Sequence, residues 1–285
     1  MLYVVATPIG NLGDISNRAL EILSSCDLIA AEDTRRTQKL LAHFQIKKPL
    51  ISYYEHNKVS RGPMLLEKLR SGETIALVSD AGTPGISDPG ADLIRAAAED
   101  GIPVSMAPGP VAGIMALVLS GLSTEKFVFE GFVGTDRQKR EEFAKMIAGE
   151  RRTTVLYEAP HRLVKTLELL HEAAPGRRTA VCRELTKTYE EIRRGTPEEH
   201  LAYFTAQEPR GEFVIVIEGA LPDEPGKTAV APETVYQKTE AILKAAADAG
   251  ERKGKNDALK EAANALGLSK NQAYAMYEEI KRTLL

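Results

Sequence analysis

The chain has 285 residues, 43% hydrophobic and 27% charged, which is ordinary for a globular protein long enough to form two cores. Its formal charge of −3 excludes a globally basic protein, so any contact with nucleic acid must come from a local patch. The sequence has no run of about 18 apolar residues that would predict a membrane span, and no Cys or His cluster that would predict a structural metal. Cys26 and Cys182 are far apart in the chain and no signal-peptide pattern is present, so we expect free thiols in a cytoplasmic protein.

Apolar runs of strand length alternate with amphipathic runs of helical length through the first half of the chain. Strands are predicted at residues 2–6, 28–31, 74–79 and 103–106, and helices at 16–25, 35–44, 91–100 and 111–120. This alternation predicts a parallel sheet with helices on its faces. We therefore expect an N-terminal α/β domain that covers residues 1–122.

Strand signals return at residues 127–129, 153–157, 180–185 and 213–218, with a helix at 162–173 between them. They predict a second α/β domain over residues 123–220, with a cleft between it and the first. Its last strand is rich in Val and Ile, which is typical of a strand buried at the centre of a sheet.

A small helical domain is expected at the C-terminal end, over residues 230–285. Apolar residues recur at helical spacing over 255–266, and Ser269 with Gln272 forms a capping-box pattern that opens a last helix to about residue 284. Two helices joined in this way resemble a helix-turn-helix, a shape that forms more often for packing than for reading DNA.

The segment from Val78 to Gly90 is the most informative motif. It holds three glycines, two prolines and two aspartates directly after a buried strand. Glycine allows a close approach of backbone to a ligand, whereas proline stiffens a loop. A loop with both is pre-shaped rather than flexible, and α/β proteins bind ligands at this end of their strands.

Charged or Gly/Pro-rich motifs also follow at least four other predicted strands. The loop from Thr7 to Asp14 lacks the spacing of a dinucleotide or P-loop motif, so NAD and ATP are poorly supported. The remaining three are Ala31-Glu-Asp-Thr-Arg35, Tyr157-Glu-Ala-Pro-His-Arg162 and Arg183-Glu-Leu-Thr-Lys187. Their concentration at strand ends favours one cleft between two α/β units.

Some of these motifs have a purely structural alternative. Asp33 or Thr34 could simply cap the helix predicted at 35–44, and Glu158 could cap the helix predicted at 162–173. The segment from Tyr53 to Asn57 could hold a base or ribose, or could be a surface loop. The charged run from Arg137 to Arg152 is interpreted as an ordinary solvated face.

The motifs together resemble the tetrapyrrole methylase superfamily. Ala81-Gly-Thr-Pro84 and Pro108-Gly-Pro110 resemble its shared loops, and the motifs at residues 6–15, 31–35, 157–162 and 183–187 resemble those of the bacterial small-subunit rRNA 2′-O-methyltransferases within it. The resemblance implies S-adenosylmethionine in the cleft, a homodimer, and methyl transfer to a cytidine ribose in the decoding region of 16S rRNA. Val111 departs from the pattern, since the family often has serine there.

The resemblance also implies which residues form the site. The cofactor would contact Pro8, Asp80, Ala81, Gly82, Thr83, Pro84, Ile86, Ser87, Val111, Ala112, Leu156, Tyr157 and Leu185. The catalytic candidates are Asp33, Arg35, Glu158, Arg162 and Glu184, together with Glu32 and His161 as further possible bases. We favour Asp33 or Glu184 as the base.

Arginines at strand ends lead to a prediction about charge. Arg35, Arg162 and Arg183 are expected to form a positive cleft rim, on which Arg35 and Arg162 hold phosphate. Two alternatives stay open: a methylase of the same superfamily acting on a tetrapyrrole or a protein, and a non-catalytic ribosome-binding protein.

Overall fold

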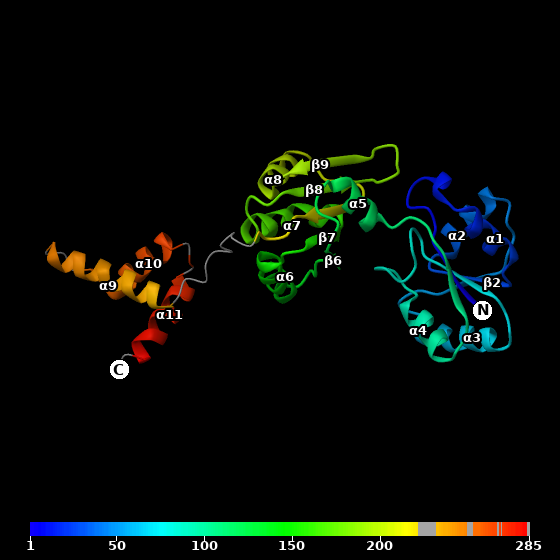
Figure 1. The fold of residues 1–285 in the computed structure, drawn as a ribbon, viewed down its shortest axis with the longest axis horizontal. Helices are drawn as coiled ribbons and strands as arrows, with labels where there is room; N and C mark the ends of the chain where they lie inside the picture. The colour runs from blue at the N-terminus through cyan, green and yellow to red at the C-terminus, as the bar shows by residue number, and fades with distance from the viewer. Residues whose placement is uncertain (222–231, 250–252, 267, 269, 284–285) are drawn as a thin grey trace. The chain divides into compact units, whose positions relative to one another are not determined.

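The computed structural model describes residues 1–221, 232–249, 253–266, 268 and 270–283. The chain divides into two compact units, with the first ending at Leu221 (Figure 1). Ser269, the predicted cap of the last helix, lies outside the described residues.

The first sheet is entirely parallel and has the order β3-β2-β4-β1-β5. Its strands are β1 (Leu2–Val5), β2 (Leu28–Ala31), β3 (Leu50–Ser52), β4 (Ile75–Val78) and β5 (Val104–Ala107). Every residue of β2 and β4 is buried, because these central strands are covered on both faces.

Helices cover the two faces of this sheet in pairs. One apolar cluster joins the sheet to α1 (Asn17–Ser25) and α2 (Thr34–His43), and a second joins it to α3 (Lys58–Arg70) and α4 (Ala91–Glu99). A short turn, η1 (Leu12–Asp14), lies in the loop after β1. The predicted parallel sheet with helices on its faces is confirmed.

The second sheet is mixed, with the order β6-β7-β10-β8-β9. Its strands are β6 (Phe127–Phe132), β7 (Thr153–Glu158), β8 (Thr179–Arg183), β9 (Glu191–Gly195) and β10 (Phe213–Ile217). Only β6 and β7 run parallel; the other neighbouring pairs are antiparallel. The Val/Ile-rich strand β10 is central and wholly buried, as predicted.

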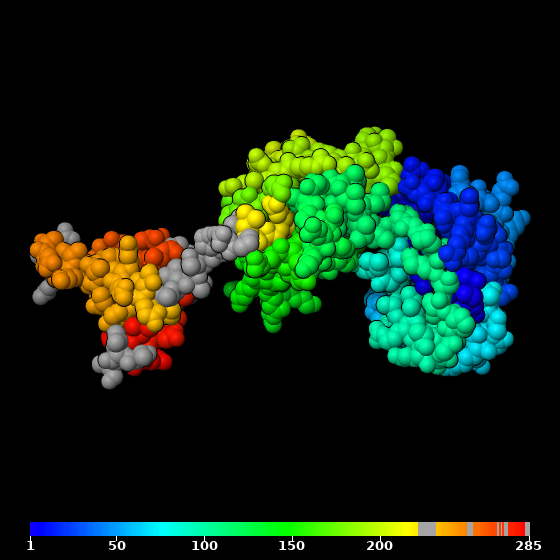
Figure 2. Space-filling model, viewed as in Figure 1, coloured from blue at the N-terminus to red at the C-terminus, as the bar shows by residue number. Residues whose placement is uncertain are grey.

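One face of the second sheet packs on α6 (Arg137–Gly149), α7 (Pro160–Ala173) and α8 (Pro197–Ala206). The other face packs on α5 (Ala112–Ser120). The predicted boundary at residue 122 would assign α5 to the first domain, yet its apolar side chains pack on the second sheet. In the space-filling view of this unit, the residues of the first sheet and its helices are blue to cyan-green and those of the second sheet are green to yellow (Figure 2).

The charged run after Arg137 forms helix α6, which sequence patterning did not predict as a helix. It buries only Phe143 and Ile147 against the sheet, so its apolar stripe is narrow. Strand β9 was missed for a similar reason: its sequence is Glu-Ile-Arg-Arg-Gly, which lacks a buried face.

The second unit contains α9 (Pro232–Asp248), α10 (Lys255–Ala265) and α11 (Lys270–Thr283). They pack around Val235, Leu259, Ala263, Ala273 and Tyr277. This confirms a helical C-terminal part. Among the described residues, no helix combines the length and apolar character needed to span a membrane.

Candidate functional site

A cavity of about 370 Å³ lies where the ends of β4 and β7 meet the start of α5. Its size is within the range of small-molecule sites. Nine predicted site residues line it: Ala81, Gly82, Thr83, Ile86, Ser87, Val111, Ala112, Tyr157 and Glu158. The other lining residues are Ile9, Asp88, Phe132, Ala159, Pro160, Glu212, Phe213 and Val214.

Backbone contacts hold the loop after β4 in place. The amide of Thr7 donates to the carbonyl of Gly82 over 2.8 Å, and the amide of Gly82 donates back over 2.9 Å. Gly82 has a φ of +80°, and a Cβ there would lie 3.3 Å from Ile9 Cγ2. The left-handed backbone and the close neighbour together explain why glycine stands at this wall of the cavity.

The start of α5 forms a second wall. Val111 is its N-cap and offers no side-chain acceptor, so backbone N–H groups of the first turn stay available to an anionic ligand group. The Gly113 amide is an exception, since it donates to the Tyr157 hydroxyl over 3.1 Å. A Cβ on Gly113 would press on Phe129, Tyr157 and Val155, so this residue lets the helix approach the second sheet closely.

An aromatic wall comes from β6 and β7. The Tyr157 ring makes edge contacts with Phe129 and Phe132, at centroid distances of 5.0 and 5.7 Å. Burial raises the pKa of the Tyr157 phenol, which therefore stays protonated at neutral pH. Phe132 lines the cavity and is largely exposed, so its ring can cover a planar ligand.

Glu158 is bound from three sides at the end of β7. Its side chain is 0% exposed; Arg162 pairs with it at 2.7 Å, the Thr166 hydroxyl donates over 2.6 Å, and the Ala159 amide donates over 2.9 Å. Arg162 also donates to the carbonyl of Val133 and lies over the Phe132 ring. These contacts make Glu158 and Arg162 a buried structural pair at the base of the cavity.

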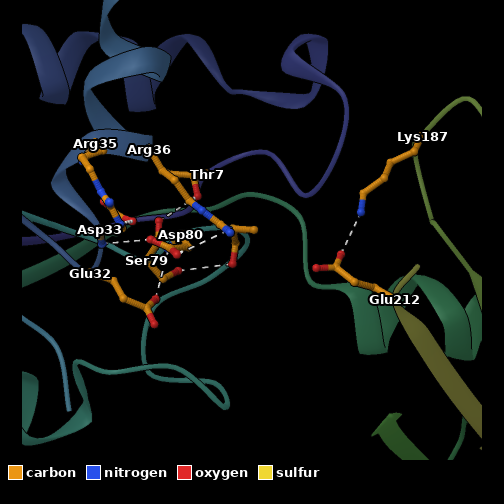
Figure 3. Close-up of polar contacts among 10 residues, drawn as sticks. Thr7, Glu32, Asp33, Arg35, Arg36, Ser79, Asp80, Lys187 and Glu212 are labelled. Carbon is orange, nitrogen blue, oxygen red and sulfur yellow. Dashed lines mark hydrogen bonds and ion pairs between the residues drawn. The ribbon is translucent and has the colours of Figure 1, made fainter. Parts of the chain in front are cut away.

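Figure 3 shows Glu32, Asp33 and Asp80 gathered at the carboxyl ends of β2 and β4. Asp80 accepts from the Asp33 amide over 2.9 Å and pairs with Arg36 at 3.4 Å. Glu32 accepts from the Asp80 amide over 3.2 Å. These contacts tie the two strand ends together.

Asp33 caps α2, which is the structural alternative raised by the sequence. Its Oδ1 accepts from the Arg35 amide over 2.8 Å, and its carboxylate pairs with the Arg35 guanidinium. The side-chain hydrogen bond from Arg35 holds the pKa of Asp33 well below its usual range. Neither residue lines the cavity, so the geometry gives Asp33 no means of acting there as a base.

The second sheet carries another charged cluster beside the cavity. Lys187 Nζ lies 3.0 Å from Glu184 and 2.8 Å from Glu212, as Figure 3 shows for the latter pair. Glu184 also accepts from the Glu212 amide. Burial opposes ionisation of Glu184, but the hydrogen bonds from Lys187 and from the Glu212 amide outweigh it and lower its pKa. Glu184 is therefore a weak base in this arrangement.

Comparison with known proteins identifies the family. Residues 1–200 match the family model described as Tetrapyrrole (Corrin/Porphyrin) Methylases. A Synechocystis protein named Ribosomal RNA small subunit methyltransferase I is 55% identical over 225 residues, 79% of this chain and 81% of its own. Proteins of that name from Bacillus subtilis and Escherichia coli O157:H7 are 46% and 45% identical, covering 79% and 89% of this chain and 77% and 90% of their own.

The chain is a tetrapyrrole methylase of the ribosomal RNA small subunit methyltransferase I family. Its fold is also similar to solved structures of the wider superfamily. The methyltransferase CobJ aligns with a TM-score of 0.58 at 18% identity, covering 77% of this chain and 94% of its own. A Thermus thermophilus uroporphyrin-III C-methyltransferase complexed with S-adenosyl homocysteine aligns with a TM-score of 0.53 at 19% identity, covering 75% and 96%.

Four residues that the family resemblance assigned to the cofactor lie outside this methylase's cavity. Leu156 is buried against the α6–α7 face, because successive side chains of β7 point to opposite faces of the sheet. Leu185 packs with α5. Pro8 and Asp80 line a separate hollow beside α2 with Arg36.

Two further predicted residues also point elsewhere. The loop after β4, residues 79–90, is called the cradle loop, and Pro84 faces the side of it that meets α4 and β5. His161 lines a groove between α6 and α7 with Arg140 and Lys165. Residue spacing could not place these side chains, since it does not fix which side of a loop each one faces.

The predicted positive rim is corrected by the pairing of its arginines. Arg35 is neutralised by Asp33 and Arg162 by Glu158, while Arg183 lies 3.6 Å from Glu191 and donates to the carbonyl of Arg210. The partners of Arg35 and Arg162 stand in the same motifs as these arginines, whereas the partner of Arg183 comes from the neighbouring strand β9.

Sequence reasoning missed eight of the lining residues, among them the charged Asp88 and Glu212 and the aromatic Phe132. Asp88 stood within the informative loop and could have been chosen there as a carboxylate on a rigid turn. Burial, and then the negative charges of Glu32 and Asp80, raise the pKa of Asp88 to about 7. Phe132 and Glu212 carried no signal, because only the sheet pairing brings them to the cavity.

Proposed function

We propose that this chain methylates the 2′-hydroxyl of a cytidine ribose in the decoding region of 16S rRNA. It is a methyltransferase and uses S-adenosylmethionine, as its family membership establishes. The proposal of an rRNA substrate is supported by the relatives named for small-subunit rRNA methylation, which are 45–55% identical over most of each chain. The superfamily structures are 15–20% identical and support the fold alone.

The cavity fits this cofactor on its own chemistry. When bound, S-adenosylmethionine supplies a methyl group made electrophilic by a sulfonium. Free backbone N–H groups at the start of α5 suit its carboxylate, and the Phe132 and Tyr157 rings suit its adenine. Gly82 leaves room for a ligand against the backbone.

The protein's contribution to the reaction is positioning. The Thr7–Gly82 backbone bridge fixes the cradle loop, and the Gly113–Tyr157 hydrogen bond ties α5 to β7, so both walls of the cavity hold their shape. Alignment of an acceptor oxygen with a methyl group can supply about 7–11 kcal/mol of the barrier reduction. Rigid walls of this kind are suited to that task.

We also propose that the enzyme is a cytoplasmic homodimer. Apolar side chains are exposed on α5 and on the edge strands of both sheets, including Val118, which is 65% exposed, Ile114, Phe127 and Met106. Exposed apolar faces and open sheet edges are the features that protein interfaces cover. A second copy of the chain is the partner that a self-complementary interface would use.

Methylation of ribosomal particles tests the substrate. Purified protein, radiolabelled S-adenosylmethionine and 30S subunits from cells lacking the endogenous activity should yield label in 16S rRNA, at one ribose in the decoding region. Alkaline hydrolysis maps the label, because a 2′-O-methyl group blocks cleavage at that nucleotide. Label in a base, or no label in either 30S subunits or free 16S rRNA, would refute the proposal.

A further inference from the structure

Three carboxylates line the cavity, and two of them are already neutralised. Glu158 is paired with Arg162, and Glu212 is paired with Lys187. Asp88 has no Lys or Arg partner among the residues that the structure describes. It is therefore the cavity carboxylate whose lone pairs are free to take a proton.

The position of Asp88 is set by the cradle loop. Ser87, directly before it, has a φ of +60°, an unusual value for a residue other than glycine. Backbone in this region is unfavourable for residues other than glycine and is concentrated at functional sites. The bend places Asp88 in the cavity, just beyond the glycines that shape the wall.

The groups that face Asp88 come from three elements. Glu32 follows β2 and Asp80 follows β4, and both act on Asp88 through their negative charge; Arg36 offsets Asp80 from its other side. Tyr157 approaches from β7, and the Ser79 hydroxyl favours the ionised form of Asp88. The surroundings of Asp88 are thus acidic and partly buried, which favours binding of a proton.

We infer that Asp88 is the general base that removes the proton from the ribose 2′-hydroxyl during methyl transfer; this inference rests on the proposed function. The hydroxyl O–H bond breaks and its proton passes to an Asp88 carboxylate oxygen. The ribose oxygen forms a bond to the methyl carbon, the carbon–sulfur bond breaks, and its electron pair stays on sulfur as a neutral thioether. A carboxyl with a pKa of about 7 is matched to this task, because a base works best when its pKa lies near the working pH.

Asp88→Asn tests the role directly, since the amide keeps the shape and cannot accept the proton. We expect kcat/KM for 30S subunits to fall by about 10²–10⁴-fold. The affinity for S-adenosylhomocysteine, measured by calorimetry, should stay within about threefold. Asp92→Asn is the matched control, because Asp92 lies on α4 outside the cavity and pairs with Lys58. Its kcat/KM should match that of the wild type.

Each other outcome of this comparison contradicts the inference. Activity of Asp88→Asn within threefold of wild type would show that Asp88 takes no proton. A loss of S-adenosylhomocysteine affinity by more than tenfold would show that Asp88 binds the cofactor instead. A wild-type enzyme that methylates no rRNA would remove the proposed function, and the thermal-stability measurement below would still report on the protonation of Asp88.

The pH profile separates a base from a structural residue. The wild-type kcat/KM should fall below about pH 7, as Asp88 takes up its proton. Glu32→Gln removes a negative charge that raises this pKa, so the acid limb should move to lower pH. An acid limb that Glu32→Gln leaves in place would contradict the inference.

Thermal stability gives a readout independent of activity. A raised carboxyl pKa means that the folded protein loses stability as pH rises from about 4 through about 7, because over this range the carboxyl ionises in the unfolded chain while the folded state keeps it protonated. Asp88→Asn is free of this loss, so its Tm advantage over wild type should grow over that range and stay constant above it. A Tm difference that does not change with pH would overturn the inference.

Discussion

Replacement of Arg162 by alanine should strongly destabilise the second sheet. Arg162 is the cationic partner of Glu158, whose side chain is fully buried. Removing one member of a buried ion pair costs about 3–5 kcal/mol, because the other charge is left without compensation. The Thr166 hydroxyl and the Ala159 amide would still bind Glu158, so we expect the lower half of that range.

The free thiol of Cys182 provides the assay. The protein contains no tryptophan and only two cysteines, so a Cys26→Ala background leaves one thiol, on the buried strand β8. Burial raises the pKa of the Cys182 thiol to about 11, which keeps it unreactive in the folded protein. Its labelling by a disulfide reagent at pH 8 therefore reports opening of the second sheet.

Because about 1.4 kcal/mol corresponds to a factor of ten, Arg162→Ala should accelerate labelling by about two to three powers of ten. Arg137→Ala is the control, since Arg137 pairs with Glu141 on the exposed face of α6 and such pairs contribute below about 1 kcal/mol. Adding Glu158→Gln to Arg162→Ala should restore much of the protection. Labelling of Arg162→Ala no faster than that of Arg137→Ala would refute the structural role assigned to this pair.

Three further outcomes are expected. Gly82→Ala should lower the affinity for S-adenosylhomocysteine by more than tenfold in calorimetry, whereas Gly176→Ala, with a similar positive φ but no atom within 4 Å of the new Cβ, should leave it unchanged. Equal affinities in both variants would show that Gly82 is not needed to leave room for the ligand. Val118→Glu should convert the dimer to a monomer, as measured by light scattering. The control Val59→Glu, at a position that is 83% exposed on α3, should leave the dimer intact. A monomeric wild type would contradict the proposed interface. A hydrogen bond from Arg152 lowers the pKa of Glu150 to about 2, so Arg152→Gln should cost about 1 kcal/mol or less at pH 7. That stability is lost as pH falls from about 4.5 to 2, so the Tm difference should shrink over this range, and a constant difference would count against the pairing.

The cradle loop shows how far sequence reasoning could reach into the site. Its glycines and prolines predicted a rigid turn after a buried strand, and the structure places Gly82 and Thr83 in the wall of the cavity. The same reasoning favoured Asp33 and Glu184 as bases and did not consider Asp88. Charge type, position along a strand and a nearby opposite charge are visible in sequence: Asp33 is engaged by Arg35 and Glu184 by Lys187, each within the same motif. Tertiary packing decides instead whether a carboxylate is buried and whether a cation from another element reaches it, and no cation of the described residues pairs with Asp88.

The sequence by itself determined most strands and helices, the central place of β10 and the family, because these depend on local periodicity and on motifs contiguous in the chain. Only the tertiary structure decided where α5 packs and which side of β7 faces the cavity. It also decided that the Glu158 carboxylate beside Arg162 is fully buried. Packing of this kind comes from contacts between residues far apart in the chain, and the burial of a charge, which helps to set its pKa and its chemistry, exists only once those contacts have formed.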